Sequence, residues 1–313
     1  MRVIEVNNLK KYYGKIKAVD NLSFYVNEGE IFGMVGPNGA GKTTTIECIE
    51  GLRDPTEGEI KVLDLNPSKN RESLYQNISI QLQETSYQDK IKVYEICELF
   101  SSFYKDPLNY LELLEKFELM KFKNIFVAKL SGGQKQKLSI ILALISNPKI
   151  IFLDEITTGL DPKARRNMWN MIKNLKNEGR TVFLTTHYME EAEFLCDRVA
   201  IMDNGKIIAI DTPEKLIKIG GIEEMISFES NYDDIENLKE KLKEIKGVNN
   251  VFILDKEVKI FGKSEDLLKD LIIYLYSEKI VFKNLKTKKP NLEDTFLKLT
   301  GRHFEEEKNE NII

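Results

Sequence analysis

The chain has 313 residues, of which 42% are hydrophobic and 31% charged, enough for one large core and a second, smaller one. A formal net charge of -4 gives no overall attraction for nucleic acid, so no nucleic-acid partner is expected. Three scattered cysteines without metal-ligand spacing suggest neither a disulfide framework nor a zinc site, and no apolar run approaches the roughly 20 residues that cross a bilayer.

Taken in chain order, the first two-thirds alternate short β-branched runs with longer amphipathic stretches. This rhythm is typical of an α/β domain with a largely parallel sheet. Strands are expected at residues 31–35, 150–153 and 181–185, and antiparallel edge strands at 3–6 and 22–26. The sequence therefore predicts a mixed, mostly parallel sheet with an antiparallel edge.

Two further regions follow from the pattern of apolar residues. Between about residues 84 and 130 the β signal disappears and helical spacing takes over, which predicts an inserted helical subdomain. After Gly220 and Gly221 the order strand, helix, strand, strand, helix, strand is that of a small α+β ferredoxin-like domain. We therefore expect a large α/β domain at 1–219, an accessory domain at 220–301 and a charged, disordered tail at 302–313.

A glycine-rich motif, GPNGAGKTT, follows the predicted strand at 31–35 and precedes a helix-compatible run. Glycine lets the backbone curl so that its N–H groups point at phosphate oxygens, and the helix that follows presents its positive end. In such a loop the lysine reaches the β- and γ-phosphates and the next hydroxyl coordinates Mg²⁺. The expected nucleotide-binding residues are Gly36, Pro37, Asn38, Gly39, Ala40, Gly41, Lys42, Thr43 and Thr44.

Two carboxylates, Asp154 and Glu155, come directly after the apolar run IIFL. Sheets of this class place their ligands at the carboxyl ends of buried strands, so both side chains are expected beside the phosphate loop. Asp154 is suited to hold a Mg²⁺ complex. Glu155 points to the other side of the pleat and is suited to polarise the water that attacks the γ-phosphate.

Between these two motifs lies LSGGQKQ, with Ser131, Gly132, Gly133 and Gln134 at the start of another helix. A serine followed by two glycines at a helix start is a cap and a second anion site. At this motif the chain resembles the ATP-binding-cassette ATPases. The resemblance implies a P-loop cassette fold in which the signature faces ATP bound to another subunit, so that each catalytic site is shared by two chains.

The resemblance extends to an aromatic residue and a glutamine. Tyr13, in KYYG, is similar to the aromatic that stacks on adenine, and Tyr12 is the alternative. Gln83, in ISIQLQE, resembles the glutamine that contacts Mg²⁺, and Gln81 competes with it. Gln83 fits better because a hydrophilic loop opens immediately after it.

Two loops that follow the acidic pair also match the family. TTGLDP, which contains Asp161, resembles the loop that bridges the two subunits. TTH contains His187, which is similar to the histidine that contacts the γ-phosphate. Ile156 and Thr158 depart from the proline and serine that are usual there. Both flank the chemistry, so they affect the expected loop geometry and not the assignment. The catalytic residues implied are Glu155, His187 and Lys42, with Thr43, Gln83 and Asp154 toward the metal.

The segment PNLEDTFLKLTGR resembles the terminal box of subunits from the bacterial multidrug and antibiotic exporter branch. That branch implies an ATPase that uses ATP and Mg²⁺, forms a dimer and powers a separately encoded membrane permease from the cytoplasmic face of the membrane. The alternative is a soluble ATPase of the same family with a regulatory role outside transport.

Overall fold

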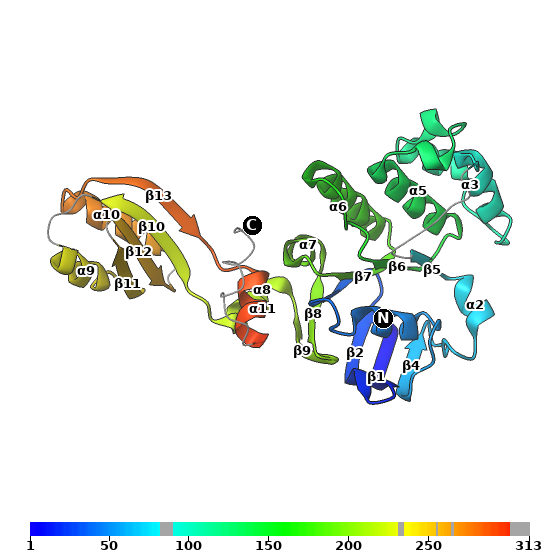
Figure 1. Ribbon diagram of the computed structural model, residues 1–313, viewed down its shortest axis with the longest axis horizontal. Helices are drawn as coiled ribbons and strands as arrows, with labels where there is room; N and C mark the ends of the chain where they lie inside the picture. Colours follow the sequence, from blue (N-terminus) through cyan, green and yellow to red (C-terminus); the bar gives the residue numbers. More distant parts are fainter. Residues whose placement is uncertain (82–89, 231–234, 255, 264–265, 301–313) are drawn as a thin grey trace. The chain divides into compact units, whose positions relative to one another are not determined.

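The computed structural model describes residues 1–81, 90–230, 235–254, 256–263 and 266–300. The chain divides into two compact units, Met1–Pro213 and Glu214–Ile313, which are described separately (Figure 1).

The first unit begins with a three-stranded antiparallel sheet in the order β2-β1-β4. Its strands are β1 (Arg2–Tyr13), β2 (Ile16–Asn27) and β4 (Glu57–Val62). The two-residue connection between Tyr13 and Ile16 contains Gly14 at φ 58°, a value that tight hairpin turns require. The expected strands at 3–6 and 22–26 lie inside β1 and β2, which are longer and, with β4, form a sheet of their own.

A six-stranded sheet in the order β5-β6-β7-β3-β8-β9 forms the centre of this unit. It is parallel except for β9, which runs antiparallel to β8. All residues of the three middle strands are buried, as expected of a parallel sheet that is covered on both faces. The strands are β3 (Ile31–Val35), β5 (Ile78–Gln81), β6 (Ile150–Asp154), β7 (Thr181–Thr186), β8 (Arg198–Asp203) and β9 (Lys206–Asp211).

Helices cover one face of this sheet. Figure 1 shows α5 and α6 on one side and the strands of the three-stranded sheet on the other. The expected helical region at about 84–130 contains α3, α4, η1 and η2 among its described residues. The helices are α1 (Lys42–Ile49), α2 (Arg71–Tyr75), α3 (Val93–Ser101), α4 (Tyr110–Lys116), η1 (Met120–Phe122), η2 (Val127–Lys129), α5 (Gly132–Ile145), α6 (Pro162–Asn177) and α7 (Met189–Leu195).

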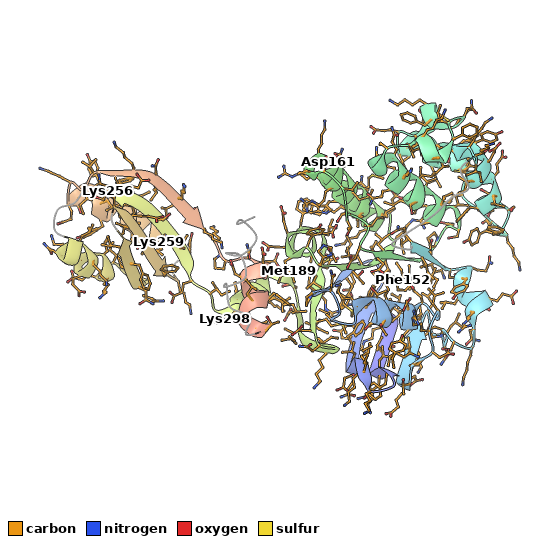
Figure 2. All side chains as sticks on the ribbon, viewed as in Figure 1. Phe152, Asp161, Met189, Lys256, Lys259 and Lys298 are labelled. Atoms are coloured by element: carbon orange, nitrogen blue, oxygen red, sulfur yellow. The ribbon has the colours of Figure 1, made fainter. Side chains whose placement is uncertain are left out.

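The layer between the two sheets is a continuous apolar core that includes part of α1. Phe24 stacks on Phe32 with ring centroids 5.4 Å apart, and Phe183 lies 5.5 Å from Phe32 and 5.8 Å from Phe152. Phe152 is labelled in Figure 2. These rings fix β3, β6 and β7 side by side, so the segments that leave their carboxyl ends meet at one edge of the sheet.

The second unit contains a four-stranded antiparallel sheet in the order β11-β12-β10-β13. Leucine, isoleucine and valine side chains from the sheet and two helices form its core. The elements follow the expected chain order, and their assignment to the ferredoxin-like class stays a prediction. They are α8 (Pro213–Gly220), β10 (Glu224–Ser230), α9 (Ile235–Lys243), β11 (Val248–Leu254), β12 (Glu257–Gly262), α10 (Leu267–Ser277), β13 (Phe282–Lys288) and α11 (Leu292–Thr300).

Within the described ranges, no helix is both long enough and apolar enough to cross a membrane.

Candidate active site

The glycine-rich loop joins β3 to α1, and its backbone leaves no room for larger residues at two positions. Gly41 has φ 101°, and a Cβ there would lie 2.3 Å from the carbonyl oxygen of Ala18. A Cβ on Gly36 would lie 2.2 Å from the carbonyl oxygen of Met202. Real Cβ atoms do not approach so closely, so the loop keeps its tight curve only with glycine at these positions.

Lys42 is the first residue of α1, and its side chain turns back into the loop. Only 4% of Lys42 is exposed, and its Nζ donates hydrogen bonds to the carbonyl oxygens of Gly36 (2.9 Å) and Pro37 (3.1 Å). Burial lowers the pKa of Lys42, while the negative charges of Glu155 and Asp154 oppose that shift. Lys42 is thus a cation in a poorly hydrated loop. Additional negative charge beside its Nζ would stabilise its protonated form.

The acidic pair lies at the end of β6, with the two side chains in different surroundings. Asp154 is buried, it accepts a hydrogen bond from the Thr185 hydroxyl, and burial raises its pKa. The Glu155 backbone has φ 48°, and its N–H donates to the Thr185 carbonyl over 3.1 Å. A positive φ at a residue other than glycine is strained, and such strain is concentrated at functional sites.

The Glu155 carboxylate lies between two nitrogen-bearing side chains. Its Oε1 is 3.6 Å from Lys42 Nζ, and its Oε2 is 3.4 Å from His187 Nδ1. His187 directly follows β7, and its ring packs on that of Tyr188 with centroids 4.1 Å apart. The structure therefore brings together three residues that are far apart in the chain: Lys42, Glu155 and His187.

A cavity of 790 Å³ opens beside this group. The loop residues that line it are Asn38, Gly39, Gly41, Lys42, Thr43 and Thr44, together with Glu155. Ala40 is buried within the loop, where its N–H donates to the Pro37 carbonyl over 3.2 Å. The expected phosphate-loop residues thus line a single cavity or form the turn that supports it.

Residues that the sequence did not single out complete the cavity. They are Ile16, Lys17 and Ala18 of β2 and Asn204 and Gly205 between β8 and β9. Thr185, which bonds Asp154, was also missed. Its position just before the expected histidine, in the run TTH, was the available signal.

The two candidate aromatic residues, Tyr12 and Tyr13, differ in hydrogen bonding and in exposure. The Tyr12 hydroxyl donates to Asp20 over 2.9 Å. Tyr13 is 40% exposed at the end of β1, with the Arg53 guanidinium carbon 5.8 Å from the centroid of its ring. Tyr13 is therefore the more accessible ring, although it is not among the residues that line the 790 Å³ cavity.

The serine-glycine motif forms the start of α5 as a reciprocal cap. The Ser131 N–H donates to Gln134 Oε1 over 2.9 Å, and the Gln134 N–H donates to Ser131 Oγ over 3.4 Å. Nothing lies within 4 Å of a Cβ placed on Gly132, so this end of the helix is open. On Gly133 such a Cβ would be 3.7 Å from the Ala164 side chain, an ordinary contact.

Asp161 caps α6 and faces the same open space. Its carboxylate accepts hydrogen bonds from the N–H groups of Lys163 (3.0 Å) and Ala164 (2.9 Å), and it is labelled in Figure 2. A second cavity, of 910 Å³, is lined by Ser131, Gly132, Gly133, Gln134 and Asp161. It shares no lining residue with the phosphate-loop cavity. Within one chain the two motifs therefore do not form one site.

The metal assignments rest on hard oxygen donors. Thr43 is exposed at the phosphate-loop cavity, and Asp154 supplies a buried carboxylate nearby. Gln83 lies outside the described residues, and Gln81, the alternative, is a buried residue at the end of β5. In the described part of the chain no three His, Cys, Asp or Glu side chains cluster as a metal site. This donor set fits Mg²⁺, which uses one or two protein oxygens together with phosphate and water.

Comparisons with known proteins identify the family. Residues 19–158 match the ABC transporter family. The chain is 34% identical to the linearmycin resistance ATP-binding protein of Bacillus subtilis (strain 168), over 96% of this chain and 99% of that protein. It is also 34% identical to the Nod factor export ATP-binding protein I of Rhizobium etli, over 97% and 95% of the two chains.

Solved structures show the same fold. An ATP-binding subunit of an ABC transporter matches with a TM-score of 0.64 and 28% identity, covering 70% of this chain and 93% of that one. A dimeric ATP-binding cassette in a post-hydrolysis state, bound to ADP and Pi, matches with a TM-score of 0.59 and 30% identity, over 67% and 98%.

The predicted cassette fold is thus confirmed, and the family match shows that the cassette binds ATP. The curated relatives match over nearly their whole length, so the assignment applies to the full chain and not to one motif. The chain belongs to the ATP-binding, ATP-hydrolysing subunits of ABC transporters.

Proposed function

We propose that this chain powers export through a separate membrane permease, and that it hydrolyses ATP at a site shared by two copies. The observation that carries the proposal is the Glu155 carboxylate, which lies 3.6 Å from Lys42 Nζ and 3.4 Å from His187 Nδ1 at the phosphate-loop cavity. A base held between a phosphate-binding cation and an imidazole is suited to activate a water molecule beside a bound γ-phosphate.

On ATP binding, phosphate oxygens would replace the backbone carbonyl oxygens to which Lys42 Nζ donates hydrogen bonds. Lys42 Nζ now bonds to the carbonyl oxygens of Gly36 and Pro37. Because burial lowers the pKa of Lys42, bringing negatively charged phosphate oxygens close to Nζ favours the protonated lysine. The N–H groups of the loop and of the first turn of α1 then face the same phosphates.

The adenine and the metal would occupy the edges of this cavity. The exposed ring of Tyr13 is the stacking surface for adenine. Thr43 and Asp154 would hold Mg²⁺, which neutralises phosphate charge when bound, and Gln83 is assigned to the same ion by its place in the sequence.

Hydrolysis follows from the positions of the three central side chains. Glu155 would accept a proton from the attacking water, while His187, whose Nδ1 lies 3.4 Å from the other carboxylate oxygen, would contact the γ-phosphate. Lys42 stabilises the charge that develops on the transferred phosphoryl group.

A second copy would complete each site. Ser131, Gly132, Gly133 and Gln134 line a different cavity from the phosphate loop, so their open helix end is available to ATP bound on the mate. Asp161, beside that cavity, would bridge the two copies. Loss of the γ-phosphate removes the group that both copies hold, which weakens the interface and allows it to reopen.

Export is inferred from the relatives. The B. subtilis protein is named for linearmycin resistance and the R. etli protein for Nod factor export. We infer by analogy that this chain energises outward transport of a drug, antibiotic, lipid or similar compound. The permease would hold this chain at the cytoplasmic face of the membrane. The regulatory alternative outside transport is not favoured by these relatives.

The test is Glu155→Gln, which keeps the shape of the side chain and removes its basicity. The variant is expected to bind ATP, to hydrolyse it at least about 100-fold more slowly and to accumulate as a dimer with ATP. The matched control is Glu190→Gln, because Glu190 is exposed on α7. Wild-type turnover in Glu155→Gln would remove the proposed base, and a control that loses turnover equally would show a nonspecific effect.

A further inference from the structure

A buried polar contact joins α6 to α7 away from the phosphate-loop cavity. The indole Nε1 of Trp169 donates a hydrogen bond to Glu191 Oε1 over 2.9 Å. Trp169 is 4% exposed and Glu191 is 2% exposed. Burying a carboxylate costs free energy that an apolar side chain in the same place would avoid, so Glu191 needs another explanation than packing.

The two helices that this contact joins begin next to proposed catalytic and interface residues. α6 starts directly after Asp161, and α7 starts at Met189, two residues after His187. Met189 and Asp161 are both labelled in Figure 2. A contact between these helices therefore restrains both loops.

Contacts from neighbouring side chains continue toward His187. The Arg165 guanidinium carbon lies 5.9 Å from the centroid of the Trp169 ring and 5.2 Å from that of Tyr188. The Tyr188 ring in turn packs on His187, with 4.1 Å between centroids. Trp169 is thus linked through Arg165 and Tyr188 to the imidazole that faces Glu155.

The electrostatic surroundings of the carboxylate include residues of both loops. Burial raises the pKa of Glu191, and the hydroxyl groups of Thr186 and Thr157, the Trp169 N–H and the charge of Arg165 all oppose that rise. Thr186 directly precedes His187, and Thr157 follows Glu155 by two residues. Glu191 therefore lies where the segments that carry the two proposed catalytic side chains converge.

We propose that Glu191 is a positioning residue that, bonded to Trp169, holds the His187 and Glu155 segments at the separation that hydrolysis requires. The proposal rests on the proposed roles of His187 and Glu155. It assigns Glu191 no contact with ATP, because the 790 Å³ cavity is lined by other residues. Its removal should therefore slow the chemical step and leave ATP binding nearly unchanged.

The experiment measures kcat and KM for ATP in the full chain, in four single-substitution variants and in one double variant. Glu191→Ala removes the acceptor, Glu191→Gln keeps one acceptor oxygen for Trp169, and Trp169→Phe removes the donor. The fourth variant, Glu190→Gln, is a control on the same helix, where Glu190 is exposed. Unfolding midpoints and ATP affinity identify any variant whose loss of rate is a loss of folded protein.

Glu191→Ala is expected to lower kcat about 10- to 100-fold, the size of effect that small displacements of catalytic groups produce, with KM changed by less than about twofold. Glu191→Gln should recover part of that loss. The control Glu190→Gln should keep the wild-type rate. The double variant Glu191→Ala/Trp169→Phe should be no slower than Glu191→Ala alone, because both substitutions break one contact.

Three results would overturn the inference: a kcat in folded Glu191→Ala within about twofold of wild type, a loss that appears in KM instead, or fully additive effects of the two substitutions. The proposed function fails separately, since that failure would appear as absence of ATP hydrolysis in the unchanged protein.

Discussion

Gly41→Ala tests whether the backbone of the phosphate loop has the shape described. At φ 101° an alanine is strained by about 1–2 kcal/mol relative to glycine. Its Cβ would also lie 2.3 Å from the Ala18 carbonyl oxygen and 2.8 Å from Met202 Cε. Relieving such an overlap by moving backbone costs about 1–3 kcal/mol more. The variant should therefore lose about 2–5 kcal/mol of unfolding free energy.

Gly39→Ala provides the matched control in the same loop. Gly39 also has a positive φ, 80°, but nothing lies within 4 Å of a Cβ placed there. It should lose only the conformational contribution, about 1–2 kcal/mol. The difference between the two variants, about 1–3 kcal/mol, isolates the close approach of Gly41 to Ala18 of β2 and Met202 of β8.

Urea unfolding followed by tryptophan fluorescence measures this difference in the compact unit that contains the phosphate loop. Trp169 is the one tryptophan of the chain and lies in the first compact unit. With a slope of about 1–3 kcal/mol per molar urea, Gly41→Ala should unfold at a midpoint roughly 1 M below that of Gly39→Ala. Equal midpoints, or a lower midpoint for Gly39→Ala, would refute the described loop geometry.

Four other substitutions test the electrostatics and the nucleotide contacts. Lys42→Ala should weaken ATP binding at least about 10-fold in calorimetry, and unchanged affinity would contradict its phosphate role. Tyr13→Ala should raise KM for ATP several-fold with little change in kcat, whereas Tyr12→Phe should leave both unchanged; the opposite pattern would assign the stacking ring to Tyr12. Burial raises the pKa of Glu50 to about 9, so the folded state holds a proton that the unfolded state releases near pH 4.5. Stability should therefore fall between about pH 4.5 and 9 in wild type, and Glu50→Gln should flatten that fall in urea titrations at several pH values; equal slopes would contradict it.

Much of the site could be predicted because local sequence determines it. The glycines of the phosphate loop have a steric cause that depends on their spacing, and the buried strands before Gly36 and Glu155 are visible as apolar runs. The capping box of Ser131 and Gln134 is likewise a local pattern, and it forms as the helix start suggested.

The remaining features depend on which strands become neighbours. The contact of Glu155 with His187 requires β6 beside β7, and the tie between Trp169 and Glu191 requires α6 to pack on α7. No spacing along the chain encodes either contact. The same holds for Tyr12 and Tyr13, since only the bond from Tyr12 to Asp20 across the β1–β2 hairpin separates an anchored ring from an exposed one.

The antiparallel region was underestimated for a related reason. Residues 3–6 and 22–26 are the apolar parts of β1 and β2, but both strands continue through polar positions to a hairpin at Gly14. Pairing in the ladder, and not hydrophobicity, keeps those outer residues in strand conformation.

The central claim is that two copies hold ATP together, and a mixing experiment tests it most directly. Lys42→Ala damages the phosphate loop, and Ser131→Arg damages the serine-glycine cap, so each variant alone should be inactive. Mixed in equal amounts, they form heterodimers with one intact composite site, and the ATPase rate should rise to about one quarter of wild type. If heterodimers form but no activity returns, or if Ser131→Arg alone hydrolyses ATP at the wild-type rate, the shared site does not exist.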